Sequence, residues 1–228
     1  MKVSVIIPAA GTGSRMKADK NKQFLTLGGK EILAHTIAKF IDCDIYEIIV
    51  VTKEDELNYC KKEIIKRYSF NNVRLVKGGL TRQESVYNGL QSVSLESEII
   101  LIHDGARPLI KESQIQNIIA SVKDYGAVAF GVPLKDTVKV VDEDKKILNT
   151  PKRDSLVAIQ TPQAFNKEMI IKAYRKAKED GFLGTDSSSL VERAGGEVRV
   201  LDGSYENIKI TTPEDLYFAQ RTLSRRKL

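Results

Sequence analysis

Two glycines and two cations follow an apolar segment near the start of the chain. Residues 4–7 are mostly β-branched, Gly11 and Gly13 come shortly after them, and Arg15 and Lys22 follow. Glycines let backbone N–H groups approach a polyphosphate closely, and cations stabilise the charge that develops on a reacting phosphate. The spacing therefore predicts a loop at which a phosphate is bound and also reacts.

The same loop begins like a dinucleotide-binding fingerprint but does not complete it. Met16 stands where the third glycine would be, and no acidic residue closes a second strand about 20 residues later to bind a ribose. The Walker pattern is also missing from the sequence. A nicotinamide-dependent dehydrogenase is therefore disfavoured, and a plain strand-to-helix turn with a surface arginine remains the simpler alternative.

Two later segments place comparable residues directly after apolar strands. The pair Gly78-Gly79 precedes a helix that carries Arg82, and Asp104 follows the strand-like residues 98–103, which are apolar from 99 to 102. A helix N-terminus favours anions and hydrogen-bond acceptors, and a carboxylate behind a buried strand is costly unless it is paired, hydrogen-bonded or bound to a metal. An ordinary helix cap and a simple Asp104–Arg107 pair are the alternatives.

Strand-like and helix-like patterns alternate along the first part of the chain, and their elements would position these loops. Apolar strands are expected at residues 4–7, 47–52, 73–76, 98–103 and 127–132, with amphipathic helices at 32–40, 57–68, 82–93 and 115–122. This alternation is typical of a parallel sheet covered on both faces, in which ligands bind beyond the carboxyl ends of the strands. We therefore expect residues 9–15, 52, 77–82 and 104–108 to lie along one rim.

The alternation breaks after Pro133. Residues 136–141 alternate with period two, 142–146 form a polar turn, and 147–150 can return antiparallel. The pattern predicts a β-hairpin that projects from the α/β body. An isolated hairpin is marginally stable, so a second subunit is a natural partner for it.

The remaining residues return to helices and short strands. We expect a helix around residues 170–177, a short helix after Thr185-Asp186, and strands at 197–201 and 208–211. The last helix should begin with Thr212 as its N-cap and Pro213 at its first position.

Composition limits the remaining possibilities. The 228 residues suffice for one large α/β domain, and no apolar run approaches the length of a membrane span. The net charge of +6 suits an anionic partner, but few aromatic residues accompany the cations, so a nucleic-acid surface is a weak alternative. Cys43 and Cys60, expected on helices, are not spaced as metal ligands and indicate reduced thiols in a cytoplasmic protein without a signal peptide.

The two histidines also limit the chemistry. His35 and His103 are too few for an expected zinc site or a Ser-His-Asp triad, and we expect His103 to be structural.

Taken together and in order, these motifs resemble the 2-C-methyl-D-erythritol 4-phosphate cytidylyltransferases of the non-mevalonate isoprenoid pathway. The resemblance covers essentially the whole chain and departs from the family at Gly105, where Ala is common, and at Ser187, where an acidic residue often stands. The matching segments are Pro8–Met16, Lys22–Phe24, Gly78–Val86, His103–Pro108, Asp136–Lys139, Gln160–Gln163, Thr185–Asp186 and Asn207–Thr211.

The resemblance implies a fold and a reaction. The fold would be a Rossmann-like α/β nucleotidyltransferase fold with a mostly parallel central sheet flanked by helices and a projecting β-hairpin arm. Residues 1–228 would form one domain, and the arm at about 136–158 would be an insertion that exchanges across a homodimer. The enzyme would transfer CMP from CTP to a sugar-alcohol phosphate by in-line attack on the α-phosphorus, releasing pyrophosphate, with Mg²⁺ or another divalent cation. No nucleic acid and no membrane would be involved.

The resemblance also implies roles for particular residues. Four cations would be catalytic: Arg15, Lys22, Arg153 and Lys209. CTP would contact Ala9, Ala10, Gly11, Gly13, Gly79, Arg82, Ser85, Asp104, Gly105 and Ala106. The second substrate would contact Asp104, Arg107, Thr137, Arg153, Thr185 and Lys209. Asp104 is the candidate metal ligand.

Two related transferases are the nearest alternatives. A ribitol 5-phosphate cytidylyltransferase would share the fold and chemistry, but the segments Pro8–Gly11 and Asp136–Lys139 favour the methylerythritol enzymes. A hexose 1-phosphate nucleotidyltransferase is disfavoured by the chain length and by the hairpin.

Overall fold

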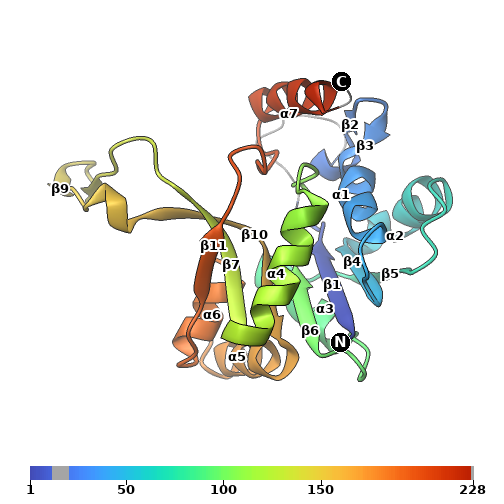
Figure 1. Ribbon diagram of the computed structural model, residues 1–228, viewed down its shortest axis with the longest axis horizontal. Coiled ribbons are helices and arrows are strands. Elements are labelled where there is room, and N and C mark those ends of the chain that lie inside the picture. Colours follow the sequence, from blue (N-terminus) through green and yellow to red (C-terminus); the bar gives the residue numbers. More distant parts are fainter. Residues whose placement is uncertain (12–20, 227–228) are drawn as a thin grey trace.

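A seven-stranded sheet forms the centre of the computed structural model, which describes residues 1–11 and 21–226 (Figure 1). Its order is β11-β7-β10-β6-β1-β4-β5. The strands are β1 (Val3–Pro8), β4 (Glu47–Thr52), β5 (Val73–Lys77), β6 (Ile99–Ile102), β7 (Ala127–Pro133), β10 (Val157–Asn166) and β11 (Arg199–Asp202). Within the described residues, β10 alone runs against the others, so the sheet is mostly parallel, as expected.

Helices cover both faces of this sheet. One face holds α1 (Ile32–Ile41), the π-helical segment Cys60–Lys66 and α4 (Glu112–Tyr125), and the other holds α3 (Arg82–Gln91), α5 (Lys167–Glu179) and α6 (Ser187–Arg193). The strands carry apolar residues at successive positions. Because neighbouring side chains point to opposite faces of the sheet, these residues pack against the helices on both faces.

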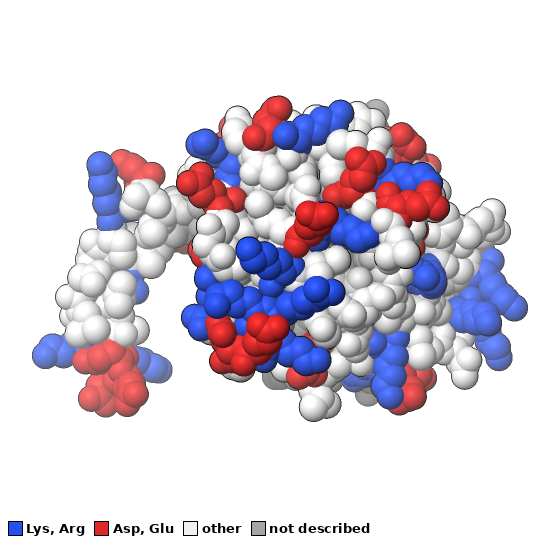
Figure 2. Space-filling model, turned by 90° about the horizontal axis from the view of Figure 1, so that it is seen from below, with Lys and Arg blue, Asp and Glu red and all other residues white. Residues whose placement is uncertain are grey.

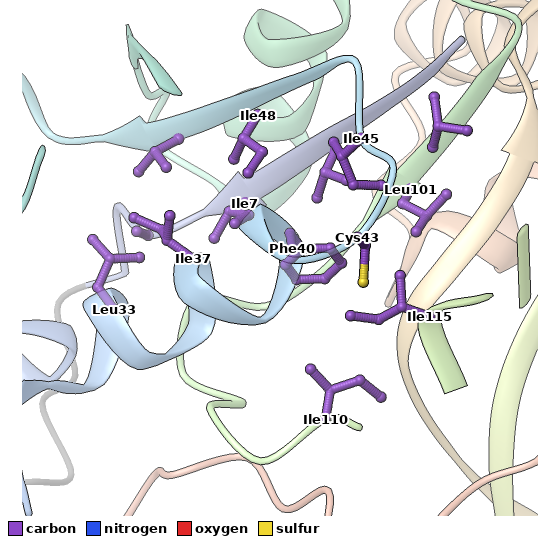
Figure 3. Packing of buried hydrophobic residues seen from close by; sticks show 14 of the residues in the cluster. Ile7, Leu33, Ile37, Phe40, Cys43, Ile45, Ile48, Leu101, Ile110 and Ile115 are labelled. Atoms are coloured by element: carbon purple, nitrogen blue, oxygen red, sulfur yellow. The ribbon is translucent and has the colours of Figure 1, made fainter. Parts of the chain in front are cut away.

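The packing of α1 illustrates how one face is buried. Figure 3 shows Phe40 and Ile37 of α1 directed toward Ile7 of β1 and Ile48 of β4, while Ile6 packs with the helices of the opposite face. All of these side chains are fully buried. The alternation along β1 therefore fixes which helices lie on which side.

Helix α7 (Pro213–Arg225) and a small ribbon close one end of the molecule. The ribbon pairs β2 (Thr26–Leu27) with β3 (Lys30–Glu31), and a third apolar cluster joins it to α7. Thr212 caps α7 and Pro213 occupies its first turn, which confirms the predicted start. Short helical turns complete the described fold at Lys22–Phe24, Glu54–Glu56, Leu57–Tyr59 and Arg153–Ser155.

The arm projects well away from the body in Figure 1 and has less strand than the sequence predicted. Only β8 (Val140–Val141) and β9 (Ile147–Asn149) pair, whereas 136–139 run as irregular backbone. Pro151 follows β9 closely, and a proline has no N–H to donate to a facing strand. The hairpin prediction is confirmed, and its predicted strand length is wrong.

Three further expectations need correction. The sequence predicted no strand at residues 157–166, but β10 forms there and accommodates Pro162 at an irregularity between Gln160 and Gln163. Residues 208–211 form no strand, and only the Ile210 N–H reaches a neighbouring loop, at the Ala106 carbonyl (2.8 Å). Cys43 lies just beyond the end of α1 rather than on it.

The order of the strands places a crevice beside β1. The chain adds β4 and β5 on one side of β1 and then crosses to add β6 on the other. Such a reversal of strand order opens a ligand-binding crevice at the carboxyl ends of the strands. Among residues 1–11 and 21–226, no helix has the length and apolarity needed to cross a bilayer.

Candidate active site

A cavity lies in this crevice. It is lined by the loops that follow β1, β5 and β6, together with Lys22 and Gln23 from one other segment and Lys209 from another. The lining consists of Pro8, Ala9, Ala10, Gly11, Lys22, Gln23, Gly79, Leu80, Thr81, Arg82, Ser85, Asp104, Gly105, Ala106 and Lys209. The predicted rim is therefore confirmed over its described part. We call this the first cavity.

Backbone hydrogen bonds join the loops that follow β1 and β5 to the end of β4. The Ala9 N–H donates to the Val51 carbonyl (2.7 Å), and the Gly78 N–H donates to the Thr52 carbonyl (2.7 Å). At Gly78 a Cβ would lie 2.8 Å from the Ala10 Cβ, so only glycine lets these two loops approach so closely.

Helix α3 begins at the wall of the first cavity. Thr81 caps the helix by accepting a hydrogen bond from the Glu84 N–H, and the buried Ser85 hydroxyl accepts one from the Gly79 N–H (3.1 Å). The Leu80 N–H is bound by the Glu84 carboxylate (2.7 Å). These bonds fix the glycine loop against the helix, with Arg82 in the first turn.

Gln23 fastens the start of the first loop from below. Its side chain is 2% exposed, and its amide donates to the carbonyls of Ala9 and, at 3.2 Å, Gly11. The same helical turn, Lys22–Phe24, carries Lys22 to the cavity lining. A buried side-chain amide therefore connects the loop after β1 to the turn that carries Lys22, one of the predicted catalytic cations.

Asp104 is surrounded by three cations. Its carboxylate lies 3.1 Å from the Arg82 guanidinium, 2.9 Å from the Lys209 ammonium and 3.7 Å from Nε of Arg107. Burial alone would raise the pKa of Asp104, but these cations, Arg82 foremost, hold it far below its ordinary value. Asp104 is therefore ionised, and the three cations and one carboxylate leave two formal positive charges for an anionic ligand.

A second cavity adjoins the first and shares Arg82, Asp104 and Lys209 with it. It is lined further by Arg107, Ile159, Gln160, Thr161, Gln163, Thr185, Asp186, Ser188, Ser189 and Glu192. The cation cluster thus forms a common wall between two spaces, so ligands in both would meet at Asp104 and its partners.

The segment that carries Lys209 is held by a buried network. Asn207 is fully buried. Its side-chain amide donates to the Thr161 carbonyl (2.8 Å), and its backbone carbonyl accepts from the Arg107 guanidinium (2.6 Å). The Ile210 N–H donates to the Ala106 carbonyl on the other side of Lys209. Lys209 therefore reaches Asp104 from a backbone fixed on both sides.

His103 supports this loop from within the core and is structural, as predicted. It is fully buried, with its Nε2 3.0 Å from the Arg107 carbonyl and its Nδ1 3.2 Å from the Thr161 hydroxyl. Burial lowers the pKa of His103 to about 4. A neutral ring that donates from Nε2 and accepts at Nδ1 satisfies both contacts, and the same hydroxyl accepts the Asp104 N–H (3.0 Å).

Four predicted site residues are not among the described lining residues of the two cavities. Gly13 and Arg15 lie outside the described residues. Thr137 and Arg153 are exposed on the arm and belong to neither set of lining residues, and the Arg153 guanidinium donates to the Lys135 carbonyl (3.1 Å). The remaining predicted residues line one cavity or both.

The donor atoms available to a metal are few. Asp104 is the one carboxylate among the described lining residues of the first cavity, and no cluster of three acidic, histidine or cysteine side chains occurs within residues 1–11 and 21–226. A divalent cation here would have to take most of its ligands from substrate phosphates and water, as Mg²⁺ commonly does.

Comparison with known proteins supports an assignment. The sequence pattern of the 2-C-methyl-D-erythritol 4-phosphate cytidylyltransferases matches residues 3–225. The chain belongs to this family. Among its relatives, the cytidylyltransferase of that name from Caldanaerobacter subterraneus is 51% identical over 222 residues, which cover 96% of this chain and 98% of the relative. The relative from Clostridium acetobutylicum is 48% identical over 225 residues, with 98% of each chain covered.

Solved structures of the family have the same fold. A 4-diphosphocytidyl-2C-methyl-D-erythritol synthase from Anaerococcus prevotii superposes with a TM-score of 0.86 at 38% identity, covering 98% of this chain and 96% of the other. A cytidylyltransferase from Thermus thermophilus gives 0.82 at 30% identity, covering 99% and 100%. The predicted resemblance, the Rossmann-like fold and the enzyme class are confirmed: the chain is a cytidylyltransferase. The ribitol 5-phosphate alternative is not favoured by these matches.

Sequence reasoning assigned no role to several residues that the fold brings to the site. Thr161 binds both His103 and the Asp104 backbone, and the fully buried Gln163 accepts the Ser187 and Ser188 N–H groups at 3.2 Å each. The family motif Gln160–Gln163 pointed to these residues. Because β10 was not predicted, the motif could not be placed beside Asp104 from the sequence.

Proposed function

We propose that this protein transfers CMP from CTP to 2-C-methyl-D-erythritol 4-phosphate and releases pyrophosphate. The observation that carries the proposal is the shared wall of Arg82, Asp104 and Lys209 between two adjoining cavities. CTP would fill the first cavity and the sugar-alcohol phosphate the second. The two phosphates that must react would then meet at the cation cluster.

The first cavity suits a nucleotide because part of its wall consists of backbone and small side chains, with cations beside it. Residues 9–11, Gly79, Gly105 and Ala106 have no side chain larger than a methyl group to place in the space, and Ser85 orients the Gly79 amide. Gly13 would extend this contact. Backbone N–H and carbonyl groups can read the cytosine edge and hold the triphosphate without bulky side chains.

The second cavity suits a phosphate monoester because Arg107 and Lys209 face it beside Arg82. Thr185 lies across this space and would bind a hydroxyl of the sugar alcohol. Asp104, already ionised, would orient Lys209 and Arg82 and also accept a hydroxyl hydrogen bond.

The chemistry needs charge compensation more than a general base. The second pKa of a phosphate monoester is near ~6, so the nucleophile is largely a dianion at neutral pH. Its oxygen would attack the α-phosphorus in line, forming a new P–O bond as the bond to the bridging oxygen of the β-phosphate breaks. Lys22, which lines the first cavity, and Arg15 would stabilise the charge that develops there.

We also propose that Mg²⁺ or another divalent cation accompanies CTP. Asp104 would be the protein carboxylate nearest to it, with phosphate oxygens and water as its other ligands. The metal would neutralise triphosphate charge.

We infer that the arm, about residues 136–158, is a dimerisation insertion that crosses to a second copy. Val140, Val141, Ile147 and Leu148 are 41%, 47%, 57% and 59% exposed, which is unusual for a cluster of aliphatic side chains. In Figure 2 the charged side chains of the arm gather toward its two ends, with uncharged surface between them. A partner would cover that surface, and Thr137 and Arg153 would reach the second cavity of the other subunit.

Co-expression tests the crossing. Chains with Lys22→Ala are mixed with chains carrying Arg153→Ala, and activity of isolated mixed dimers is measured. If the arm crosses, one site of a mixed dimer contains both lesions and the other is intact, so about half of the wild-type activity returns. Mixed dimers as inactive as the two parents would show that each arm serves its own subunit.

We also propose a cytoplasmic location, which the two cysteines support. Cys43 and Cys60 are both free and buried, and burial raises the pKa of the Cys60 thiol to about 12, which suits a reducing cytoplasm. On the face in Figure 2, Lys and Arg are interspersed with Asp and Glu rather than gathered into a basic track. We therefore propose no nucleic-acid partner.

Pyrophosphate release measures the proposed reaction directly. The protein is assayed with CTP, UTP and ATP against 2-C-methyl-D-erythritol 4-phosphate, and with CTP against ribitol 5-phosphate. We expect release with CTP and the methylerythritol substrate to exceed the other combinations by at least about a hundredfold. Equal or faster release with ribitol 5-phosphate would refute the substrate assignment.

A further inference from the structure

Gln83 connects α3 to the loop at residues 182–184, which leads to the second cavity. Its side-chain amide donates to the Phe182 carbonyl (2.9 Å), and its side-chain carbonyl accepts the Gly184 N–H (2.9 Å). Both ends of the side chain are thus used, in the manner of one rung of a β-ladder. Within the described part of the chain, no other α3 side chain hydrogen-bonds to residues 182–184.

The bridged loop leads directly into the second cavity. Thr185, which lines that cavity, follows Gly184, and Asp186 caps α6 by accepting the Ser189 N–H (2.9 Å). A Cβ at Gly184 would lie 2.5 Å from a Leu190 methyl group, so the loop is already wedged against α6. Gln83 therefore clamps the side of the loop that α6 does not hold.

The direction of the Gln83 side chain separates it from its neighbours. Arg82 and Ser85 line the first cavity, whereas Gln83 is not among the described lining residues of either cavity. Successive residues of a helix point about 100° apart, so adjacent positions in one motif serve different surfaces. Gln83 thus faces the loop at residues 182–184 rather than the first cavity.

We propose that Gln83 is a positioning residue for the sugar-alcohol phosphate. Its two hydrogen bonds fix the Phe182 and Gly184 backbone. They thereby hold the next residue, Thr185, in its position in the wall of the second cavity. The inference rests on the proposed assignment of the second cavity to that substrate. It predicts that Gln83, although it belongs to the Gly78–Val86 segment that would bind CTP, affects the affinity for the sugar-alcohol phosphate.

The test compares the two Michaelis constants. Gln83→Met keeps the length of the side chain and removes both hydrogen bonds, so we expect KM for the sugar-alcohol phosphate to rise about tenfold. KM for CTP should stay within about twofold, and kcat at saturation should change little. Gln83→Glu keeps an acceptor for the Gly184 N–H but loses the donor, so a smaller rise of about threefold is expected from it.

Asn88 provides a matched control on the same helix. Its amide donates to the Lys77 carbonyl (3.1 Å) and so binds α3 to β5 instead of to the loop. Asn88→Leu should leave both Michaelis constants within about twofold of the wild type. Thermal unfolding of all variants verifies that they are folded, and Gln83→Glu carries the test if Gln83→Met does not fold.

The possible outcomes are distinct. A rise confined to KM for CTP, an equal rise in both constants, or no change in either would overturn the role of Gln83. Failure of the wild-type protein to release pyrophosphate with the methylerythritol substrate would instead refute the proposed function. A selective rise in KM for the sugar-alcohol phosphate supports the inference.

Discussion

Mild acid offers a quantitative test of the buried histidine beneath the site. Burial lowers the pKa of His103 from 6.5 to about 4, so the unfolded chain takes up the proton first. The contribution of the neutral His103 to the free energy of unfolding is therefore fully present above the unfolded pKa of 6.5. It falls as the pH drops from there toward 4. At pH 5 the unfolded histidine is about 1.5 units past its pKa, which costs about 2 kcal/mol at about 1.4 kcal/mol per unit.

Urea unfolding at pH 7 and pH 5 measures this loss. His103→Gln removes the titrating group, and because both proteins keep His35 and the same carboxylates, their other titrations cancel. The variant will be less stable at pH 7, since Thr161 and the Arg107 carbonyl lose their partner. The gap between the two proteins should shrink by about 2 kcal/mol at pH 5. A gap that is the same at both pH values would refute the buried, neutral assignment.

Three further changes test other parts of the site. Lys209→Ala removes a charged contact to Asp104 and should lower kcat/KM for the sugar-alcohol phosphate about 10- to 100-fold in steady-state assays; a loss under twofold would contradict its role. Lys22→Ala should lower kcat more than it raises KM for CTP, because its contact strengthens as charge develops; an unchanged kcat would exclude it as a stabiliser. If the proposed dimer forms through the arm, Ile147→Asp combined with Leu148→Asp should convert it to monomers in sedimentation velocity, and a persistent dimer would place the interface elsewhere.

Much of the α/β body could be predicted because its signals are local. The apolar runs of β1, β4 and β6 and the periodic apolar residues of α1 and α4 need no knowledge of the rest of the chain. Residues in loops that follow parallel strands must lie at one edge of the sheet. That rule alone placed Gly79 and Asp104 together, and the lining of the first cavity bears it out.

Strand β10 shows where local reasoning fails. Its partners, β6 and β7, are distant in sequence, and their hydrogen bonds stabilise a polar, proline-containing segment that has little strand preference of its own. The same holds at residues 208–211, where the pattern suggested a strand but the segment pairs with no strand of the described sheets. Tertiary pairing decided both cases.

The sequence by itself determined the family, the chemistry and the identity of most charged residues at the site. Only the tertiary structure decided how those charges combine. From the sequence alone Asp104 could have paired with Arg107 only, whereas the structure shows it shared by Arg82, Arg107 and Lys209, which lie up to 105 positions away. Spacing along a chain says little about such meetings, because they depend on how helices and loops pack across the whole sheet.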